Sequence, residues 1–339
     1  MPAKKSTKRN ALIISGIIIF ILWSFAYLSH GLYTLGFADW QELLTNENSF
    51  LQTLVWNVRM PRLMLVLILG AGLSAAGMTC QNLLRNDLAT PGILGVITGG
   101  NFGVTLAVAT GAMMISPWIL PVMSFSFGML CMLITLLLSM EGGRIISRRV
   151  MLIGIALSSV VGSMSGLISI FIRVDSFNYI TAFLTSSLTK ANWDFVYMSA
   201  PCVLVGWLWI FKKSRTLDVI SLGDEPATSL GVPIDLTKLL LLVPAVAITG
   251  VCVAVGGGFA FLGLLAPHIA RKIVGSNSKK IMLACLLIGP GLLLAAESIS
   301  RWFFPLTEIP AGVFISAIGA PYFLYLLIKN GKRNELAFA

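Results

Sequence analysis

Residues 61–80, "PRLMLVLILGAGLSAAGMTC", form a stretch that is apolar throughout after Arg62, apart from small hydroxyl residues. A helix that crosses a bilayer requires about 20 predominantly apolar residues, which is the length of this stretch. Within it, Gly70 and Ser74 are spaced as a small-xxx-small pair, and so are Gly72 and Ala76. Small residues at this spacing let membrane helices approach closely, because packing drives helix association in lipid. The stretch therefore predicts a transmembrane helix with a packing face.

The turn that follows this stretch is polar. Residues 81–91 read "QNLLRNDLATP", and the proline begins the next apolar stretch. We expect a tight turn here, in which Arg85 and Asp87 pair with each other.

Comparable apolar stretches recur along the whole chain of 339 residues. The chain is 57% hydrophobic and only 11% charged, whereas soluble domains carry about 25% charged residues. This composition predicts an all-α, polytopic membrane protein with about ten transmembrane helices. The eighth stretch is rich in glycine and proline, so we expect a short or broken helix there, with nine or eleven crossings as alternatives. The predicted stretches are residues 11–29, 61–80, 91–111, 118–139, 150–172, 195–211, 238–256, 259–274, 281–300 and 311–328.

The distribution of basic residues predicts the orientation. Short cytoplasmic loops of membrane proteins carry an excess of Lys and Arg. With the N-terminus inside, nineteen of the 24 Lys and Arg residues fall on the cytoplasmic side. We therefore predict that residues 1–10 are a cytoplasmic basic leader, that residues 11–339 are one transmembrane domain, and that both termini are cytoplasmic. The net charge of +10 follows from this topology and indicates no nucleic-acid partner. The basic residues left outside are Arg59, Arg62, Arg173, Lys190 and Arg301.

The fifth stretch carries a stripe of small residues. Ser158, Gly162, Ser165 and Ser169 recur at steps that place them on one face of a helix. The stripe either seats a neighbouring helix or lines a wide, weakly polar passage for a bulky solute. The sequence does not decide between these two interpretations.

Residues 222–232, "LGDEPATSLGV", interrupt the apolar pattern in a predicted cytoplasmic loop. Asp224 or Glu225 is expected to cap the first N–H groups of a short helix, and Gly231 is expected to end it. Such a helix is either a solvated loop element or a knob that fits into a partner's cleft. Its exposed apolar residues favour the knob, and we predict these to be Leu222, Ala227, Leu230 and Val232.

Several kinds of chemistry have no motif in this sequence. It contains no G-x-x-x-x-G-K-[ST] loop for ATP phosphates, no G-x-S-x-G and no H-E-x-x-H. The two histidines and five cysteines are scattered, so we expect no metal site and no cofactor on this chain. Ion-coupled transporters keep ionisable residues near the bilayer midplane. The embedded acids here are few, with Glu297 near an outer helix end and Glu308 in a loop, so the energy for transport is expected to come from elsewhere.

Taken together, these segments resemble the FecCD-type permeases, the membrane subunits of ABC importers for iron–siderophore complexes, haem and vitamin B12. The resemblance implies the type II ABC importer permease fold, in the bacterial cytoplasmic membrane. It implies a second permease subunit, identical or paralogous, two ATP-binding subunits that hold ATP and Mg²⁺, and an extracytoplasmic binding protein. It covers nearly the whole chain and rests on "RMPR" (59–62), "GAGLSAAGMTCQNLLRNDLATPGILGV" (70–96), "SLGDEPATSLGV" (221–232), "GGGFAFLGLLAPHIAR" (256–271) and "EIPAGVFISAIGAPYFLYLL" (308–327).

The resemblance also implies roles for particular residues. Outward-facing Arg59, Arg62 and Arg301 would receive acidic residues of the binding protein, although arginines at this depth also serve as interface anchors. Many members have "AD" where this chain has "AESIS", so Glu297 retains an acid that could pair with Arg301. Residues 221–232 would form the coupling helix that docks into the ATPase, through Leu222, Gly223, Asp224, Glu225, Ala227, Leu230 and Gly231.

The resemblance implies import of a ferric siderophore, and haem and cobalamin remain open as solutes. An ion-coupled secondary transporter is an alternative that the shortage of midplane acids disfavours. An intramembrane enzyme is a third, disfavoured because no nucleophile, base and metal set converges in the sequence.

Overall fold

The computed structural model describes residues 2–45, 50–116, 118–142, 144–172, 185–307 and 309–338. The predicted outer Arg173 and the loop acid Glu308 lie outside the described residues. Within them the protein is almost entirely helical. The strands there are β1 (Met140–Glu141) and β2 (Arg144–Ile145), which pair antiparallel in a small hairpin.

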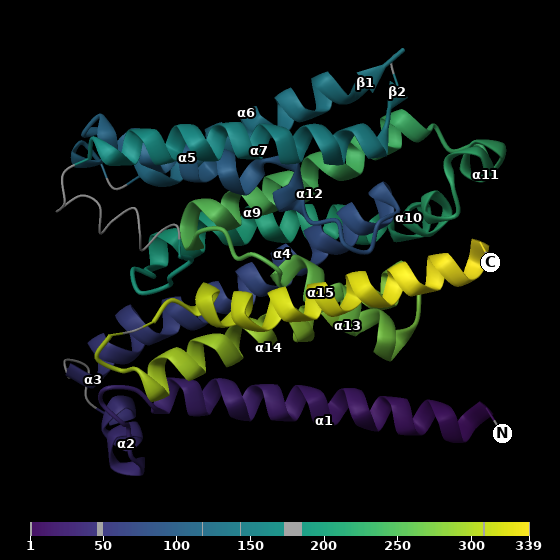
Figure 1. Cartoon of the computed structure of the whole chain (residues 1–339). Helices are drawn as coiled ribbons and strands as arrows, with labels where there is room; N and C mark the ends of the chain where they lie inside the picture. The colour runs from purple at the N-terminus through teal and green to yellow at the C-terminus, as the bar shows by residue number, and fades with distance from the viewer. Residues whose placement is uncertain are drawn as a thin grey trace.

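Each of the ten predicted stretches corresponds to a helix, and Figure 1 shows these helices running side by side in one bundle. Six spans of the described residues are long and apolar enough to cross a membrane. The all-α, polytopic prediction is therefore confirmed. The ten helices are α1 (Pro2–Ser29), α4 (Met60–Leu84), α5 (Val96–Ala109), α6 (Ile119–Ser139), α7 (Ser147–Ile170), α9 (Trp193–Lys212), α12 (Ile234–Gly256), α13 (Leu262–Val274), α14 (Ser278–Phe303) and α15 (Ala311–Phe338).

Shorter elements connect these helices. A π-helical segment joins α3 to α4 without a break, so that one apolar span runs over Phe50–Leu84. Two short helices follow α9 and lead into α12. The shorter elements are α2 (Phe37–Thr45), α3 (Phe50–Gln52), η1 (Thr53–Arg59), η2 (Pro91–Leu94), η3 (Ala112–Met114), α10 (Ser214–Ser221) and α11 (Asp224–Ser229).

Helix α4 is the centre of the core, packed against α9, α12, α13 and α14. A Cβ added at Gly70 would lie 2.5 Å from the Pro290 Cα of α14, and one at Gly72 would lie 2.9 Å from the Ile248 side chain of α12. Ser74 and Ala76 are fully buried. The packing face predicted from the small-xxx-small spacing is thus confirmed.

The eighth predicted stretch forms a short helix that follows a break in the chain, as its glycines and proline indicated. Helix α12 ends at Gly256, and the chain then passes through Gly257 and Phe261, both with positive φ, before α13 begins. Helix α13 has only 13 residues. Gly77 of α4 lies directly against Gly263 of α13, so the backbones of the two helices touch. Irregular backbone at membrane depth is tolerated where other protein buries it, and here Gly258 packs against Ile97 of α5 and Phe259 is buried.

The two ends of the bundle differ. Figure 1 shows the N-terminus, the C-terminal end of α15 and helices α10 and α11 at one end, with α2 and α3 at the other. Placing both chain ends on one side agrees with an even number of crossings. That this side faces the cytoplasm stays a prediction.

Helix α7 lies at the edge of the bundle. Only 6% of its apolar window is buried, compared with 78% for the span that contains α4. Most of the apolar surface of α7 is therefore left uncovered by the described part of this chain. Its exposed large residues include Leu152, Ile155, Val160, Met164 and Leu167.

Candidate functional site

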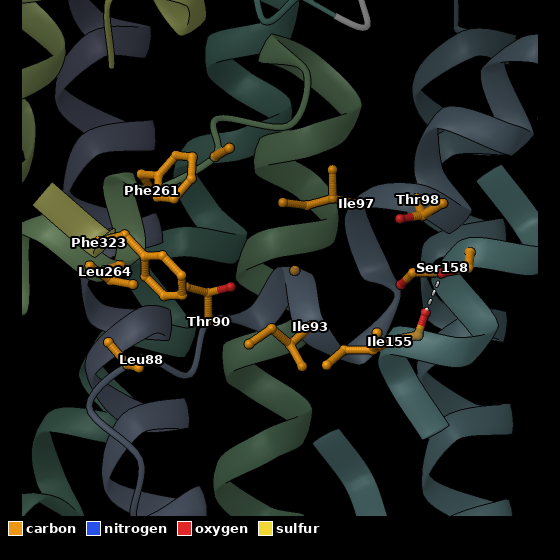
Figure 2. Close-up of a pocket in the computed structure, with 13 residues that line it drawn as sticks. Leu88, Thr90, Ile93, Ile97, Thr98, Ile155, Ser158, Phe261, Leu264 and Phe323 are labelled. Atoms are coloured by element: carbon orange, nitrogen blue, oxygen red, sulfur yellow. Dashed lines mark hydrogen bonds between the residues drawn. The ribbon is translucent and has the colours of Figure 1, made fainter. Parts of the chain in front are cut away.

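A cavity of about 570 Å³ opens beside α7, and Figure 2 shows the side chains around it. Its wall combines the segment around η2 with parts of α5, α7, α13 and α15. The polar side chains are hydroxyls, and Phe261 and Phe323 supply aromatic surface. None of the described residues that line the cavity is charged. The lining consists of Leu88, Thr90, Gly92, Ile93, Ile97, Thr98, Ile155, Ser158, Ser159, Ala260, Phe261, Leu264 and Phe323.

The predicted stripe on α7 divides into two parts. Ser158 lines the cavity, and its hydroxyl is buried without a hydrogen-bond partner in the described part of the chain. Gly162 lies next to the Thr98 side chain. Ser165 and Ser169 donate to carbonyl oxygens one turn earlier in their own helix and are not part of the cavity wall. Ser158 is therefore the residue of the stripe that lines the cavity. That Gly162, Ser165 and Ser169 line the translocation path stays a prediction.

If the stripe lines a passage, a cysteine at Ser158 should react with a water-soluble thiol reagent, in a background without the five native cysteines. Because Ser158 is part of the wall of the open cavity and Ser165 and Ser169 are not, Ser158→Cys should react faster than Ser165→Cys and Ser169→Cys. A cysteine at fully buried Thr135 in α6 is the matched control and should stay unlabelled. If Ser158→Cys, Ser165→Cys and Ser169→Cys all stay unlabelled in every nucleotide state, the stripe only seats a helix.

Helix α11 is the short helix predicted from "LGDEPATSLGV". Its C-terminus is closed by a Schellman motif, in which the Val232 N–H donates to the Ala227 carbonyl (3.0 Å) and the Gly231 N–H to the Thr228 carbonyl (2.9 Å). Gly231 adopts φ +79°, a conformation that suits glycine, so its predicted role in ending the helix is confirmed. Leu222 and Leu230 are 69% and 67% exposed, so two of the apolar residues predicted to be exposed are exposed.

Two predictions for α11 were wrong. Ala227 is fully buried, because it faces the body of the protein rather than solvent. Neither acid makes a side-chain cap to the helix N–H groups. The Asp224 carboxylate instead accepts from the Lys238 ammonium (3.0 Å) and the Arg85 guanidinium (3.2 Å), since two cations are stronger partners than backbone N–H groups that water can reach. Glu225 and Gly223 stay predicted ATPase contacts.

The expected pairing of Arg85 with Asp87 was also wrong. Arg85 ends α4 in a left-handed conformation (φ 49°), which turns the chain so that the two side chains reach different helices. Arg85 pairs with Asp224, and Asp87 accepts from Arg271 of α13 at 2.9 Å.

The three predicted docking arginines lie at the end of the bundle opposite α11, and all three are buried. Arg59 and Arg62 are 1% and 6% exposed, and Arg301 is 8% exposed. Arg59 donates to the Leu28, Ser29 and Tyr33 carbonyls and so holds the chain that leaves α1. The Arg301 guanidinium stacks over the Tyr27 ring, 5.1 Å from its centroid.

Glu297 pairs with Arg62 rather than with Arg301. The Arg62 Nε donates to the Glu297 Oε2 at 2.7 Å, and both side chains are almost completely buried. The Tyr27 hydroxyl approaches the same oxygen at 3.4 Å. The Arg62–Glu297 ion pair joins α4 to α14 and the Tyr27 hydroxyl adds α1, so the three arginines make contacts within this chain at the end opposite α11.

Sequence reasoning missed Lys238 and Arg271. Lys238 is 2% exposed although it begins an apolar stretch, and a lysine at such a position is a signal for a nearby carboxylate. Arg271 donates to Gln81 (2.7 Å), Asn82 (2.8 Å) and Asp87. No three His, Cys, Asp or Glu side chains of the described residues lie close enough to hold a metal ion.

The fold and this site define a multi-pass helical membrane protein with an uncharged cavity, and comparison with known proteins identifies the family. Residues 12–329 match the FecCD transport family, so the chain belongs to that family. It is a permease subunit with the type II ABC importer fold and not an enzyme, because separate subunits of these importers hydrolyse ATP.

Individual relatives agree with this assignment. The Fe(3+)-citrate import system permease protein YfmE of Bacillus subtilis is 35% identical over 98% of this chain and 100% of the relative. The iron(3+)-hydroxamate import system permease protein FhuG of the same organism is 33% identical over 82% of this chain and 84% of the relative. A solved structure described as an inward-facing metal-chelate type ABC transporter superposes with a TM-score of 0.82 at 25% identity, covering 94% of this chain and 99% of that one.

Proposed function

We propose that this chain carries a ferric siderophore from a binding protein into the cytoplasm, driven by ATP hydrolysis on partner subunits. The observation that carries the proposal is the uncharged cavity wall. A bare metal cation that leaves water needs oxygen or nitrogen ligands and compensating charge, which hydroxyl and aliphatic side chains do not supply. A chelate brings its own ligands. The cavity volume of about 570 Å³ lies within the range of sites for small organic ligands, roughly 300–1,000 Å³.

The identity of the relatives supports iron chelates over other solutes. The similar permeases named above import iron(3+)-hydroxamate and Fe(3+)-citrate. Haem and cobalamin are metal chelates too, and the cavity wall alone does not separate them from siderophores. The ferric siderophore is therefore proposed on the combination of the wall and the relatives.

Ion coupling finds little support in the described residues. The buried charged side chains there are Arg59, Arg62, Glu297 and Arg301 at one end of the bundle and Lys238 at the other. A transporter driven by protons or sodium ions would need such groups near the midplane. The energy is instead proposed to enter through α11, whose exposed Leu222 and Leu230 present apolar surface to an ATP-binding subunit.

A second permease subunit is proposed to cover α7. Ile155, one of the exposed apolar residues of α7, lines the cavity, so a subunit placed against α7 would enclose the cavity as well as bury those residues. Whether this subunit is an identical copy or a paralogue follows from the composition of the purified complex. The remaining proposed partners are two ATP-binding subunits and an extracytoplasmic binding protein.

The binding protein is proposed to dock at the outer end near Arg59, Arg62 and Arg301, where Arg59 and Arg301 leave a net positive charge because Glu297 neutralises Arg62. Because these side chains are buried, they are proposed to act on the binding protein through their electrostatic field at the loop that Arg59 holds, and not through direct contact. Complementary charge steers association and is screened over about 8 Å at physiological salt. The affinity of the binding protein for the complex should therefore fall as the salt concentration rises.

Substitution of Arg59 tests this docking proposal. Arg59→Gln, which loses the charge, should weaken docking and flatten the salt dependence, whereas Arg59→Lys, which keeps it, should preserve the slope. Assembly with the ATP-binding subunits is the control for folding. An unchanged slope in Arg59→Gln would leave the arginines with a purely structural role.

The function is tested by purifying the tagged chain from its native membrane and identifying the co-purifying chains and ligand by mass spectrometry. We expect a permease, an ATP-binding subunit and a ferric siderophore. Haem or cobalamin in place of the siderophore would change the solute, and the absence of any ATP-binding chain would contradict the proposal.

A further inference from the structure

One carboxylate ties α11 to two other parts of the chain, and one of its partners reaches a third. The Asp224 Oδ2 accepts from the Lys238 Nζ of α12 at 3.0 Å and from the Arg85 Nη2 at the end of α4 at 3.2 Å. The same Lys238 ammonium reaches the Ile145 carbonyl of β2 at 3.4 Å. The Lys238 side chain is only 3% exposed, whereas those of Asp224 and Arg85 are about two-fifths exposed. The Lys238 ammonium is thus buried and held in place, and Asp224 connects this ammonium to the surface helix α11.

Arg85 is followed directly by the wall of the cavity. The segment after it continues through Leu88, which lines the cavity, and then through η2, which contributes Gly92 and Ile93. This segment is held at a second point, because Asp87 accepts from Arg271 of α13, whose guanidinium also binds Gln81. Figure 2 shows Leu88, Thr90 and Ile93 on this side of the cavity.

Because α11 is short, its position depends on its contacts with the rest of the protein. A helix of six residues does not hold its position by its own hydrogen bonds, because helices that short are unstable in isolation. Its place is set by the buried Ala227 and by the Asp224 ion pairs. A displacement of α11 therefore acts on Arg85 through Asp224, and Arg85 begins the segment that forms the wall.

We propose that Asp224 is the connection by which movement of α11 is passed through Arg85 to the cavity wall at Leu88, with Lys238 as the positioning residue that holds the Asp224 carboxylate in register. This inference rests on the proposed coupling of α11 to an ATP-binding subunit. The inference identifies the contacts that transmit the movement of α11, and it assigns roles in that transmission to Arg85 and Lys238.

The test uses the assembled transporter with Leu88→Cys introduced into a background without native cysteines. The rate at which a thiol reagent labels this cysteine is measured with ATP and with ADP. We expect the two rates to differ on the order of tenfold, a typical size for coupling between sites. In Asp224→Asn the difference should disappear, while the ATP-binding subunits still assemble and hydrolyse ATP. Lys238→Met should reduce the difference between the two labelling rates, whereas Lys238→Arg, which keeps the cation, should retain it.

Glu141→Gln is the matched control. It removes a carboxylate from an exposed ion pair with Arg149 at the same end of the bundle, so the nucleotide-dependent difference should persist. A difference that persists in Asp224→Asn would overturn the inference, as would loss of the ATP-binding subunits from that variant. Failure of the proposed function would be seen separately, as absence of ferric siderophore uptake by the transporter that carries none of these substitutions.

Discussion

Replacing Glu297 with leucine should lower the free energy of unfolding by about 3–5 kcal/mol, the usual cost of removing one partner from a buried ion pair. The Arg62 guanidinium would lose the carboxylate that it contacts at 2.7 Å, in a place where both side chains are almost completely buried. Arg59 and Arg301 lie buried at the same end, so the uncompensated positive charge is larger than that of one residue. Thermal unfolding of the purified protein in detergent measures the change.

Two further variants distinguish the loss of the ion pair from nonspecific destabilisation of the protein. Glu141→Gln, in the exposed pair with Arg149, should change stability by no more than about 1 kcal/mol. The double variant Glu297→Leu with Arg62→Met should recover much of the loss, because no charge is left unpaired. Wild-type stability in Glu297→Leu alone would show that the pair does not hold the outer end together.

Replacing Gly77 with valine should also disrupt the fold strongly. A Cβ at Gly77 would lie 2.7 Å from the Gly263 Cα and closer still to its carbonyl group. Because backbone atoms rather than a flexible side chain stand in the way, α13 would have to move away from α4. Overpacking of this kind costs about 3 kcal/mol or more, at the upper end of the range for cores. The yield of monodisperse protein after detergent extraction and its unfolding temperature are the measurements.

Gly291 in α14 provides a control, because it is a glycine of a membrane helix that no neighbouring atom crowds. A Cβ there meets no atom within 4 Å, so Gly291→Ala should leave yield and unfolding temperature unchanged. Equal behaviour of Gly77→Val and Gly291→Ala would contradict the close contact between α4 and α13.

The helices could be predicted from the sequence because lipid constrains the chain so strongly. Each crossing needs a long apolar stretch, and the stretches are separated by polar turns that mark their ends. The break before α13 followed from the glycines of residues 256–258, and the packing face of α4 followed from its small residues. These are local properties, which a single sequence displays directly.

The ion pairs could not be predicted, because their partners are distant in the sequence. Glu297 pairs with Arg62, 235 residues away, and Arg271 reaches Asp87 across 184 residues. Local reasoning paired Arg85 with Asp87 and gave Asp224 a capping role, and both expectations failed because stronger partners approach from other helices. The burial of the three outer arginines was missed for the same reason.

Transport by the reconstituted complex tests the central claim most directly. The complex is placed in proteoliposomes with ATP on the side of the ATP-binding subunits and binding protein loaded with a radiolabelled ferric siderophore on the other side. The account predicts that iron accumulates only when ATP is hydrolysed and binding protein is present, and that ionophores leave the rate unchanged. Uptake that proceeds without ATP and collapses when ionophores dissipate an ion gradient would contradict it.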